Sequence, residues 1–195
     1  MRFCYAESMT EPAFYAPLAR AAEEAGYDSM VIPDSICYPA RSDSVYPFNP
    51  DGTREFLEDK PFLEPFSLIP YLGAVTQRLR FITFVLKLPV RHPVLVAKQA
   101  SSTAVLTGNR LVLGVGTSPW REDYDVLGVD WDTRGQRLDE EIAILRGLAA
   151  RGLLRAPRED LRRAVDQDRP GTDRAGARAD RRARRGGAAP GRRSR

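Results

Sequence analysis

Apolar residues along the chain fall into short continuous runs separated by stretches with helical periodicity. The runs start near residues 2, 28, 80 and 110, and each has the length of a buried strand. Between them, apolar positions recur every three or four residues, as on the buried face of a helix. These positions predict helices over about residues 10–26, 65–76 and 94–106, and another after residue 133. The predicted order of elements is therefore βαβαβαβα.

Buried strands that alternate with amphipathic helices indicate an α/β domain with a parallel sheet and right-handed crossovers. Two architectures fit this order: an open doubly wound sheet and a barrel of β/α units. Four β/α units make half of an eight-fold barrel. Residues 36–60 are rich in Pro, Gly, Asp and Ser, and are predicted to form a long loop.

Local signals mark the predicted helix ends. Thr10 is expected to cap the first helix, because its side-chain oxygen can accept from a free N–H group of the first turn. Gly26 and Gly108 are expected to end two helices in the left-handed conformation that glycine adopts without strain. Thr133 and Gln136 have the spacing of a capping box at the start of the last helix.

Charge and aromatic content divide the chain near Leu148. Residues 149–195 hold 15 arginines, 6 acidic residues and no aromatic residue, whereas residues 1–148 hold 15 basic and 20 acidic residues and every Phe, Tyr and Trp. Residues 1–148 are therefore predicted to be a globular domain. Residues 149–195 are predicted to be a disordered tail, because they cannot bury enough apolar surface to offset chain entropy. The tail could contact nucleic-acid phosphates, but without stacking groups we expect no specific recognition.

The two cysteines, Cys4 and Cys37, do not have the spacing of metal ligands, and no metal site is expected. Cys4 lies in an apolar run and is predicted to be a buried thiol. No stretch approaches 18 apolar residues, and the first 20 residues lack the apolar segment of a signal peptide. We therefore expect a cytoplasmic protein that does not interact with membranes.

The glycines that follow the fourth apolar run raise the possibility of a nucleotide site. Gly114 and Gly116 have the first two positions of a dinucleotide-binding fingerprint, but Pro119 stands where the third glycine is needed for close packing of helix and strand. The glycines are therefore interpreted as a tight strand exit, where they would leave room for a ligand ring.

A few charged residues are candidates for chemistry. Asp34 directly follows the second predicted strand, where barrels place active-site groups, although aspartate is equally typical of turns. His92, the only histidine, lies between a strand and a helix. With Lys87, Arg91 and Lys98 it either holds an anion or belongs to an ordinary charged surface.

Two adjacent pairs of acids complete the candidates. Glu122 and Asp123 are predicted to begin a short helix, where acids favour the helix N-terminus. Glu140 and Glu141 are predicted to lie on the solvated face of the last helix. The sequence shows no Ser/His/Asp arrangement and no phosphate-binding loop.

Four segments of the chain form a recognisable pattern. In order, they are AEEAGYDSMVIPDS, YPFNPDGTREFLEDKPFLEPF, VTQRLRFITFVLKLPVRHPVLVAKQASSTAVLTGNRLVLGVGTSPWREDYDVLGVDW and RGQRLDEEIAILRGL. The third is the most specific, because it joins a helix of type RHPV…AKQ to a strand exit of type LGVG…W. Together these segments resemble the luciferase-like monooxygenase family, and the loop with YP…DG resembles the subgroup that uses the deazaflavin coenzyme F420. The resemblance covers about residues 1–148.

The resemblance implies a (β/α)8 TIM barrel, of which this chain would supply the first four units. It also implies an oxidoreductase or monooxygenase that binds coenzyme F420, or alternatively FMN, at the carboxyl ends of its strands. The substrate would be a small organic molecule. The reaction would be hydride transfer, or monooxygenation with reduced FMN and oxygen.

The resemblance also implies which residues lie beside the cofactor. These are Asp34, Thr83, Phe84, Gly116 and Thr117. A non-prolyl cis peptide bond is expected near Thr83–Phe84, within a residue, as a bulge against the cofactor ring.

Two positions depart from the family pattern. Ser35 stands where many relatives have a histidine, and Pro119 stands where some deazaflavin dehydrogenases have a glutamate that donates a proton. The resemblance therefore assigns no catalytic residue, and the chemistry of the sugar-phosphate dehydrogenases is not expected.

The expected barrel is incomplete. We expect that a frameshift or truncation after Leu148 replaced the second half of the barrel with the Arg-rich sequence. Such a chain would expose sheet edges and self-associate. The alternative hypothesis is a non-catalytic half barrel that acts through assembly, or through non-specific nucleic-acid binding by its basic tail.

Overall fold

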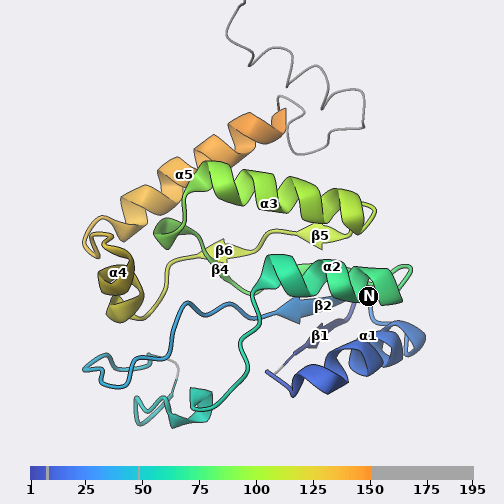
Figure 1. Ribbon diagram of the computed structural model, residues 1–195, viewed down its shortest axis with the longest axis horizontal. Helices are drawn as coiled ribbons and strands as arrows, with labels where there is room; N and C mark the ends of the chain where they lie inside the picture. Colours follow the sequence, from blue (N-terminus) through green and yellow to red (C-terminus); the bar gives the residue numbers. More distant parts are fainter. Residues whose placement is uncertain (8, 48, 151–195) are drawn as a thin grey trace, which may run out of the picture. The chain divides into compact units, whose positions relative to one another are not determined.

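A computed structural model describes residues 1–7, 9–47 and 49–150. The predicted tail lies outside these residues except for its first two, so its disorder stays a prediction. Within the described residues the chain alternates strands and helices in the predicted order (Figure 1).

The strands form one parallel sheet and a short parallel extension of it. The sheet has the order β1-β2-β3-β5, and the extension pairs β4 with β6. Because all pairings are parallel, the carboxyl ends of the strands lie at the same edge, where barrels place their active sites. The strands are β1 (Cys4–Ala6), β2 (Ser29–Ile32), β3 (Arg80–Thr83), β4 (Leu86–Lys87), β5 (Leu111–Val112) and β6 (Val115–Gly116).

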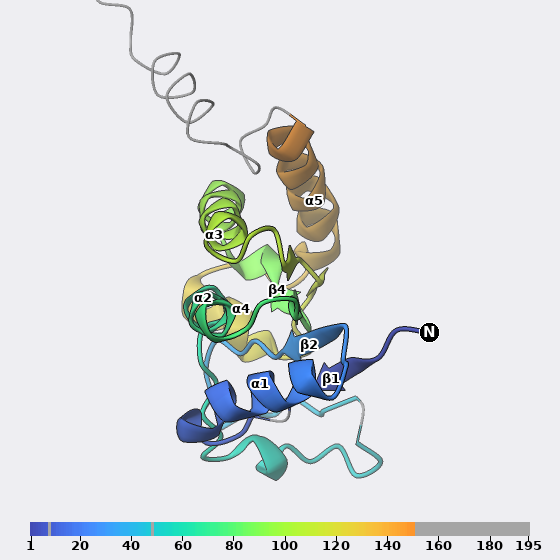
Figure 2. The same cartoon turned by 90° about the vertical axis from the view of Figure 1, so that its right-hand side faces the viewer.

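The described residues contain five α-helices and three short 3₁₀ helices, of which α4 and α5 follow the last strand. Successive helices pack against one another, α1 on α2, α2 on α3, and α3 on α5 (Figures 1 and 2). The α-helices are α1 (Tyr15–Glu24), α2 (Pro65–Val75), α3 (Pro93–Leu106), α4 (Arg121–Leu127) and α5 (Arg134–Ala150). The 3₁₀ helices are η1 (Pro12–Phe14), η2 (Glu55–Leu57) and η3 (Leu88–Val90).

The core lies between the sheet and the helices. The strand register aligns Tyr5, Met30, Phe81 and Leu111 in one row across the four strands. Met30 and Phe81 are fully buried, and Tyr5 and Leu111 pack against the same cluster, to which α1 and α2 also contribute. Since successive strand residues point to opposite faces, this register fixes which face is covered.

A second apolar cluster continues the core under α3 and α5. Leu86, Leu88 and Val96 are fully buried there, and Leu145 of α5 closes the cluster. The helical stripe predicted for the last helix is therefore confirmed.

The predicted third and fourth strands are each interrupted. The third run breaks between Thr83 and Leu86, at a cis peptide bond between Phe84 and Val85. This bond lies one residue beyond the expected Thr83–Phe84 position, within the stated margin. The fourth run breaks at Gly114, which forms hydrogen bonds with the Thr83 side chain. Apolar periodicity could not reveal these breaks, because the residues on both sides are equally apolar.

Three local predictions are wrong. Thr10 does not cap the first helix; its N–H donates to Glu7 Oε1, at 2.6 Å, and η1 precedes α1. Cys4 is exposed, because it lies near the start of the first strand. The capping box does not form, since the Thr133 hydroxyl donates to the Asp130 carbonyl and the Gln136 amide donates to Glu140.

The predicted glycine ends are confirmed. Gly26 and Gly108 have φ angles of 83° and 63° directly after their helices. The predicted long loop is also observed, with η2 as the helical turn within it.

Candidate functional site

A cavity of about 530 Å³ lies at the carboxyl ends of the strands. We call it the strand-exit cavity. Its volume is typical of pockets for small molecules and cofactors. Its lining includes Asp34, Phe84, Val85, Lys87, Thr117 and Trp120.

The structure brings three of the five predicted cofactor-binding residues together at this cavity. Asp34, Phe84 and Thr117 line it, and the Phe84 side chain is 66% exposed. An apolar ring in the lining of a cavity offers area for contact with an apolar part of a ligand. The other two residues, Thr83 and Gly116, lie behind the lining.

Thr83 and Gly116 shape the cavity wall instead of lining it. The Thr83 side chain is fully buried, and its hydroxyl donates to the Gly114 carbonyl at 2.8 Å. A Cβ atom on Gly116 would lie 3.0 Å from a methyl group of Val85. A Cβ atom on Gly114 would lie 2.2 Å from the Thr83 carbonyl oxygen. Both glycines therefore give room to the neighbouring strand, and the expectation that they also leave room for a ligand ring stays a prediction.

Asp34 is a buried anchor of the cavity edge. Its Oδ2 accepts from the Lys87 backbone N–H at 2.9 Å, and its Oδ1 accepts from Arg91 Nη2 at 2.8 Å. The side chain is 1% exposed. Charge-assisted hydrogen bonds of this kind are short and strong, so they hold the carboxylate in one orientation.

Lys87 and Asp123 form a second buried ion pair beside the cavity. Lys87 Nζ lies 2.7 Å from Asp123 Oδ2, and the two side chains are 7% and 1% exposed. Asp123 also accepts from the Ser118 hydroxyl. Asp123 lies in the first turn of α4 as predicted, but neither its burial nor its partner on a distant strand could be predicted from local residues.

Only part of the predicted cluster of basic residues is formed. Arg91, His92 and Lys98 line one hollow beside α3, although Arg91 also pairs with the buried Asp34. Lys87 lies apart from them and pairs with Asp123, so it does not belong to this cluster, and an anion site at the other three residues stays a prediction. The alternative of an ordinary charged surface is also wrong for Lys87, which is buried.

The Cys37 thiol belongs to this network but is poorly suited to nucleophilic chemistry. Its Sγ lies 3.8 Å from Asp123 Oδ1. Burial, with the charge of Asp123 as the next cause, raises the pKa of the thiol. A raised pKa keeps the thiol protonated near neutral pH, and the thiolate is the reactive form.

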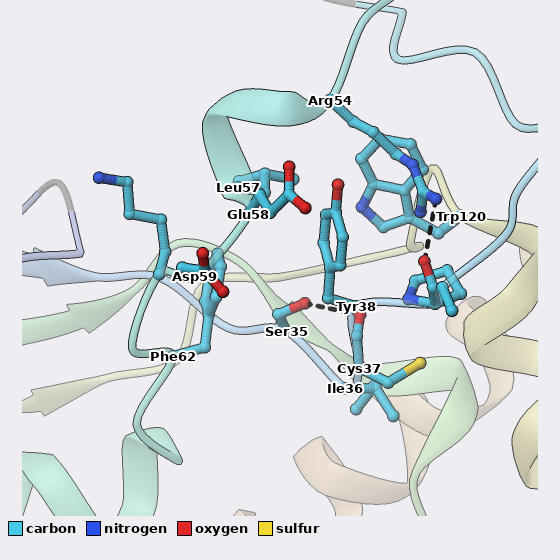
Figure 3. Close-up of a pocket in the computed structure, with 13 residues that line it drawn as sticks. Ser35, Ile36, Cys37, Tyr38, Arg54, Leu57, Glu58, Asp59, Phe62 and Trp120 are labelled. Atoms are coloured by element: carbon cyan, nitrogen blue, oxygen red, sulfur yellow. Dashed lines mark hydrogen bonds between the residues drawn. The ribbon is translucent and has the colours of Figure 1, made fainter.

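Trp120 lines both the strand-exit cavity and a second hollow, which we call the loop pocket; Ser35, Leu57 and Phe62 also line both. The loop pocket has a volume of about 710 Å³ and is built mainly from the loop between β2 and α2 (Figure 3). The Trp120 ring is stacked on Tyr46, with centroids 5.2 Å apart. In the loop pocket, the Arg54 guanidinium lies 4.7 Å from the centre of the Tyr38 ring.

One further titratable group departs from its prediction. Glu141, expected on a solvated face, is buried, and its Oε1 accepts from Arg137 Nη2 at 3.1 Å. Burial raises the pKa of Glu141 to about 6 despite the attraction of Arg137. It packs beneath η3 through Arg137, which donates to the Pro89 carbonyl.

Over the part of the chain that the structure describes, no helix is long and apolar enough to cross a membrane. Among the same residues, no group of three or more His, Cys, Asp or Glu side chains is placed to hold a metal ion.

The luciferase-like monooxygenase family matches residues 5–185 of the chain. The chain belongs to this family. The resemblance seen in the sequence is thereby confirmed, and the family match runs past Leu148, where the resemblance was expected to stop.

Members of the family that resemble this chain are considerably longer. The uncharacterized protein Rv0940c of Mycobacterium tuberculosis is 66% identical over 148 residues, which are 76% of this chain and 51% of that protein. The F420-dependent glucose-6-phosphate dehydrogenase of Nakamurella multipartita is 35% identical over 143 residues, 70% of this chain and 36% of that enzyme. The chain thus spans about half or less of the length of these relatives.

A solved structure supports the fold. The oxygenating constituent of 3,6-diketocamphane monooxygenase from Pseudomonas putida, in complex with FMN, superposes with a TM-score of 0.58 at 17% identity. The superposition covers 76% of this chain and 39% of that one. The parallel α/β arrangement therefore matches part of a luciferase-like TIM barrel, which decides between the two architectures that the sequence left open.

Proposed function

We propose that the strand-exit cavity is the part of a flavin or deazaflavin site that holds the ring, in an oxidoreductase that acts on a small organic molecule. The observation that carries this proposal is an apolar surface at the carboxyl ends of parallel strands, made by the exposed Phe84 and the half-buried Val85 beside the buried Asp34. Family membership supports the class of cofactor, because the relatives above include an F420-dependent enzyme and an FMN complex.

The cavity suits a largely uncharged ring system. Its two ion pairs, Asp34 with Arg91 and Lys87 with Asp123, join each buried carboxylate to a cation. A buried charge that already has a partner offers little to a phosphate group. The apolar side chains at the cavity would instead exclude water from the face of a ring.

The chain's own residues would orient the ring and limit the chemistry. When bound, a reduced flavin or deazaflavin supplies a hydride. Asp34, fixed by two hydrogen bonds, would hold the Lys87 backbone and the Arg91 side chain in place at the edge of the cavity beside the ring. Pro119 lines the cavity and has no proton to donate, so this position supplies no acid. We propose coenzyme F420 as the cofactor and FMN as the alternative.

Fluorescence titration of the purified chain with F420 and with FMN tests this function. We expect saturable quenching that weakens when Phe84 is replaced by alanine. Phe14→Ala is the matched control, because Phe14 is also largely exposed, at 57%, but lies in η1 away from the cavity. If neither cofactor binds saturably, the proposed function of this chain is wrong.

A further inference from the structure

Lys87 connects three strand exits. Its backbone N–H donates to Asp34, which follows β2, and its side chain reaches Asp123, which follows β6. Lys87 itself ends β4. Its Nζ also lies 3.4 Å from the Ser35 hydroxyl oxygen. One residue therefore sets the spacing of three loops that surround the strand-exit cavity.

The connection continues from Asp123 to Trp120 through one hydroxyl. Ser118 Oγ donates to Asp123 Oδ2 and accepts from the Trp120 backbone N–H at 3.0 Å. The Ser118 hydroxyl has a single proton, so these two bonds agree with one another. Ser118 and Asp123 are each 1% exposed, which protects both bonds from competition with water.

This chain of contacts ends at Trp120, one of four residues that border both hollows. Trp120 lines both the strand-exit cavity and the loop pocket, and its side chain is largely buried. Its other fixed neighbour is the Tyr46 ring, at an interplanar angle of 15°. A shift of Trp120 would therefore change the shape of both hollows together.

We propose that Lys87, Asp123 and Ser118 are positioning residues that fix Trp120 as the wall between a cofactor subsite and a substrate subsite. This inference rests on the proposed function for the assignment of the strand-exit cavity. The loop pocket is then the substrate subsite, and an organic molecule in it meets the opposite side of the Trp120 wall. A buried ion pair is weak support for stability, since apolar replacements of similar volume are often neutral or stabilising. The role of the Lys87–Asp123 pair is instead to hold Asp123 in a fixed position.

The test uses Trp120 as its own reporter. The chain has two tryptophans, so Trp131→Phe leaves Trp120 as the single one. In that background, Ser118→Ala removes the link to Asp123. We expect the acrylamide quenching constant of Trp120 to rise and the Kd for F420 or FMN to increase about fivefold, the size of one lost hydrogen bond. Ser118→Thr, which keeps a hydroxyl, is expected to restore both values.

A matched control and a second variant complete the test. Ser101→Ala removes a hydroxyl on α3 that bonds only within its own helix, to the Lys98 carbonyl, and is expected to change neither value. Asp123→Asn weakens the contact to Lys87 and is measured in case Ser118→Ala unfolds. Unchanged Trp120 quenching in a folded Ser118→Ala or Asp123→Asn chain would overturn the proposal. Loss of cofactor binding in the parent chain would instead contradict the proposed function, and the quenching result would still decide whether Trp120 is positioned in this way.

Discussion

The Thr83 hydroxyl and the Gly114 backbone form two hydrogen bonds with each other. The hydroxyl donates to the Gly114 carbonyl at 2.8 Å and accepts from the Gly114 N–H at 3.0 Å. A side chain thus replaces a backbone partner where the third and fourth strands are both interrupted. Beyond this point the backbone carries Phe84 and Val85 to the strand-exit cavity.

Replacing Gly114 with alanine is expected to destabilise the fold. The new Cβ would lie 2.2 Å from the Thr83 carbonyl oxygen, so one of the two strands must move. Overpacking in a core typically costs about 1–3 kcal/mol. Urea unfolding should show this loss, and Gly116→Ala, whose Cβ would meet only a Val85 methyl at 3.0 Å, should lose less. Equal stability of the parent and the Gly114→Ala chain would contradict the packing described here.

Removing one partner of the buried ion pair is expected to lower the stability of the fold more than removing both partners. Lys87→Met leaves the Asp123 carboxylate buried without its cation, which typically costs about 3–5 kcal/mol. The double variant Lys87→Met/Asp123→Leu should recover much of that loss, because no uncompensated charge remains. Denaturant midpoints of the single and double variants measure the difference. A double variant that is no more stable than Lys87→Met would rule out this explanation.

Glu141 is expected to make the fold less stable as the pH rises. Its folded-state pKa, about 6, is above the ordinary value of 4.5, because burial disfavours the charged form. The folded chain therefore holds this proton more tightly, and stability falls between about pH 4.5 and 6 by roughly 2 kcal/mol. Unfolding measured across this range should show the loss, and Glu141→Gln should remove it. A Glu141→Gln chain with the same pH dependence as the parent would contradict this assignment.

Glu23 is expected to make the fold more stable as the pH rises, which is the opposite of the effect of Glu141. Burial alone would raise its pKa, but hydrogen bonds from the backbone N–H groups of Arg78, Gln77 and Leu79 outweigh this and lower it. The stabilisation is therefore present above the ordinary pKa and is lost as the pH falls through the lowered value. Glu23→Gln should destabilise the chain at neutral pH and flatten this acid limb. Glu24→Gln, at the exposed end of the same helix, is the control.

The sequence predicted the elements well because their apolar periodicity is strong. Local residues predicted the alternation of strands and helices, the glycine ends of two helices and the long loop after β2. The site residues could be predicted only in part. Asp34, Phe84 and Thr117 lie at strand exits, and strand order alone brings them together.

The remaining site residues depend on contacts between distant positions. Lys87 and Asp123 are far apart in the sequence, with β5, β6 and α3 between them. Considered alone, Lys87 is predicted to be an ordinary surface charge and Asp123 an acid at the start of a helix. Their pairing follows from the parallel register, which places the ends of β4 and β6 side by side. Thr83 and Gly116 were predicted to lie beside the cofactor, but neither lines the cavity. Whether a side chain faces the cavity or the neighbouring strand depends on the local break in the strand.

Cofactor titration of the parent chain beside Phe84→Ala tests the central claim most directly. If the strand-exit cavity holds a flavin or deazaflavin ring, F420 or FMN binds saturably, and Phe84→Ala raises the Kd while Phe14→Ala leaves it unchanged. The absence of saturable binding, or equal Kd values for the parent and Phe84→Ala, would contradict the claim.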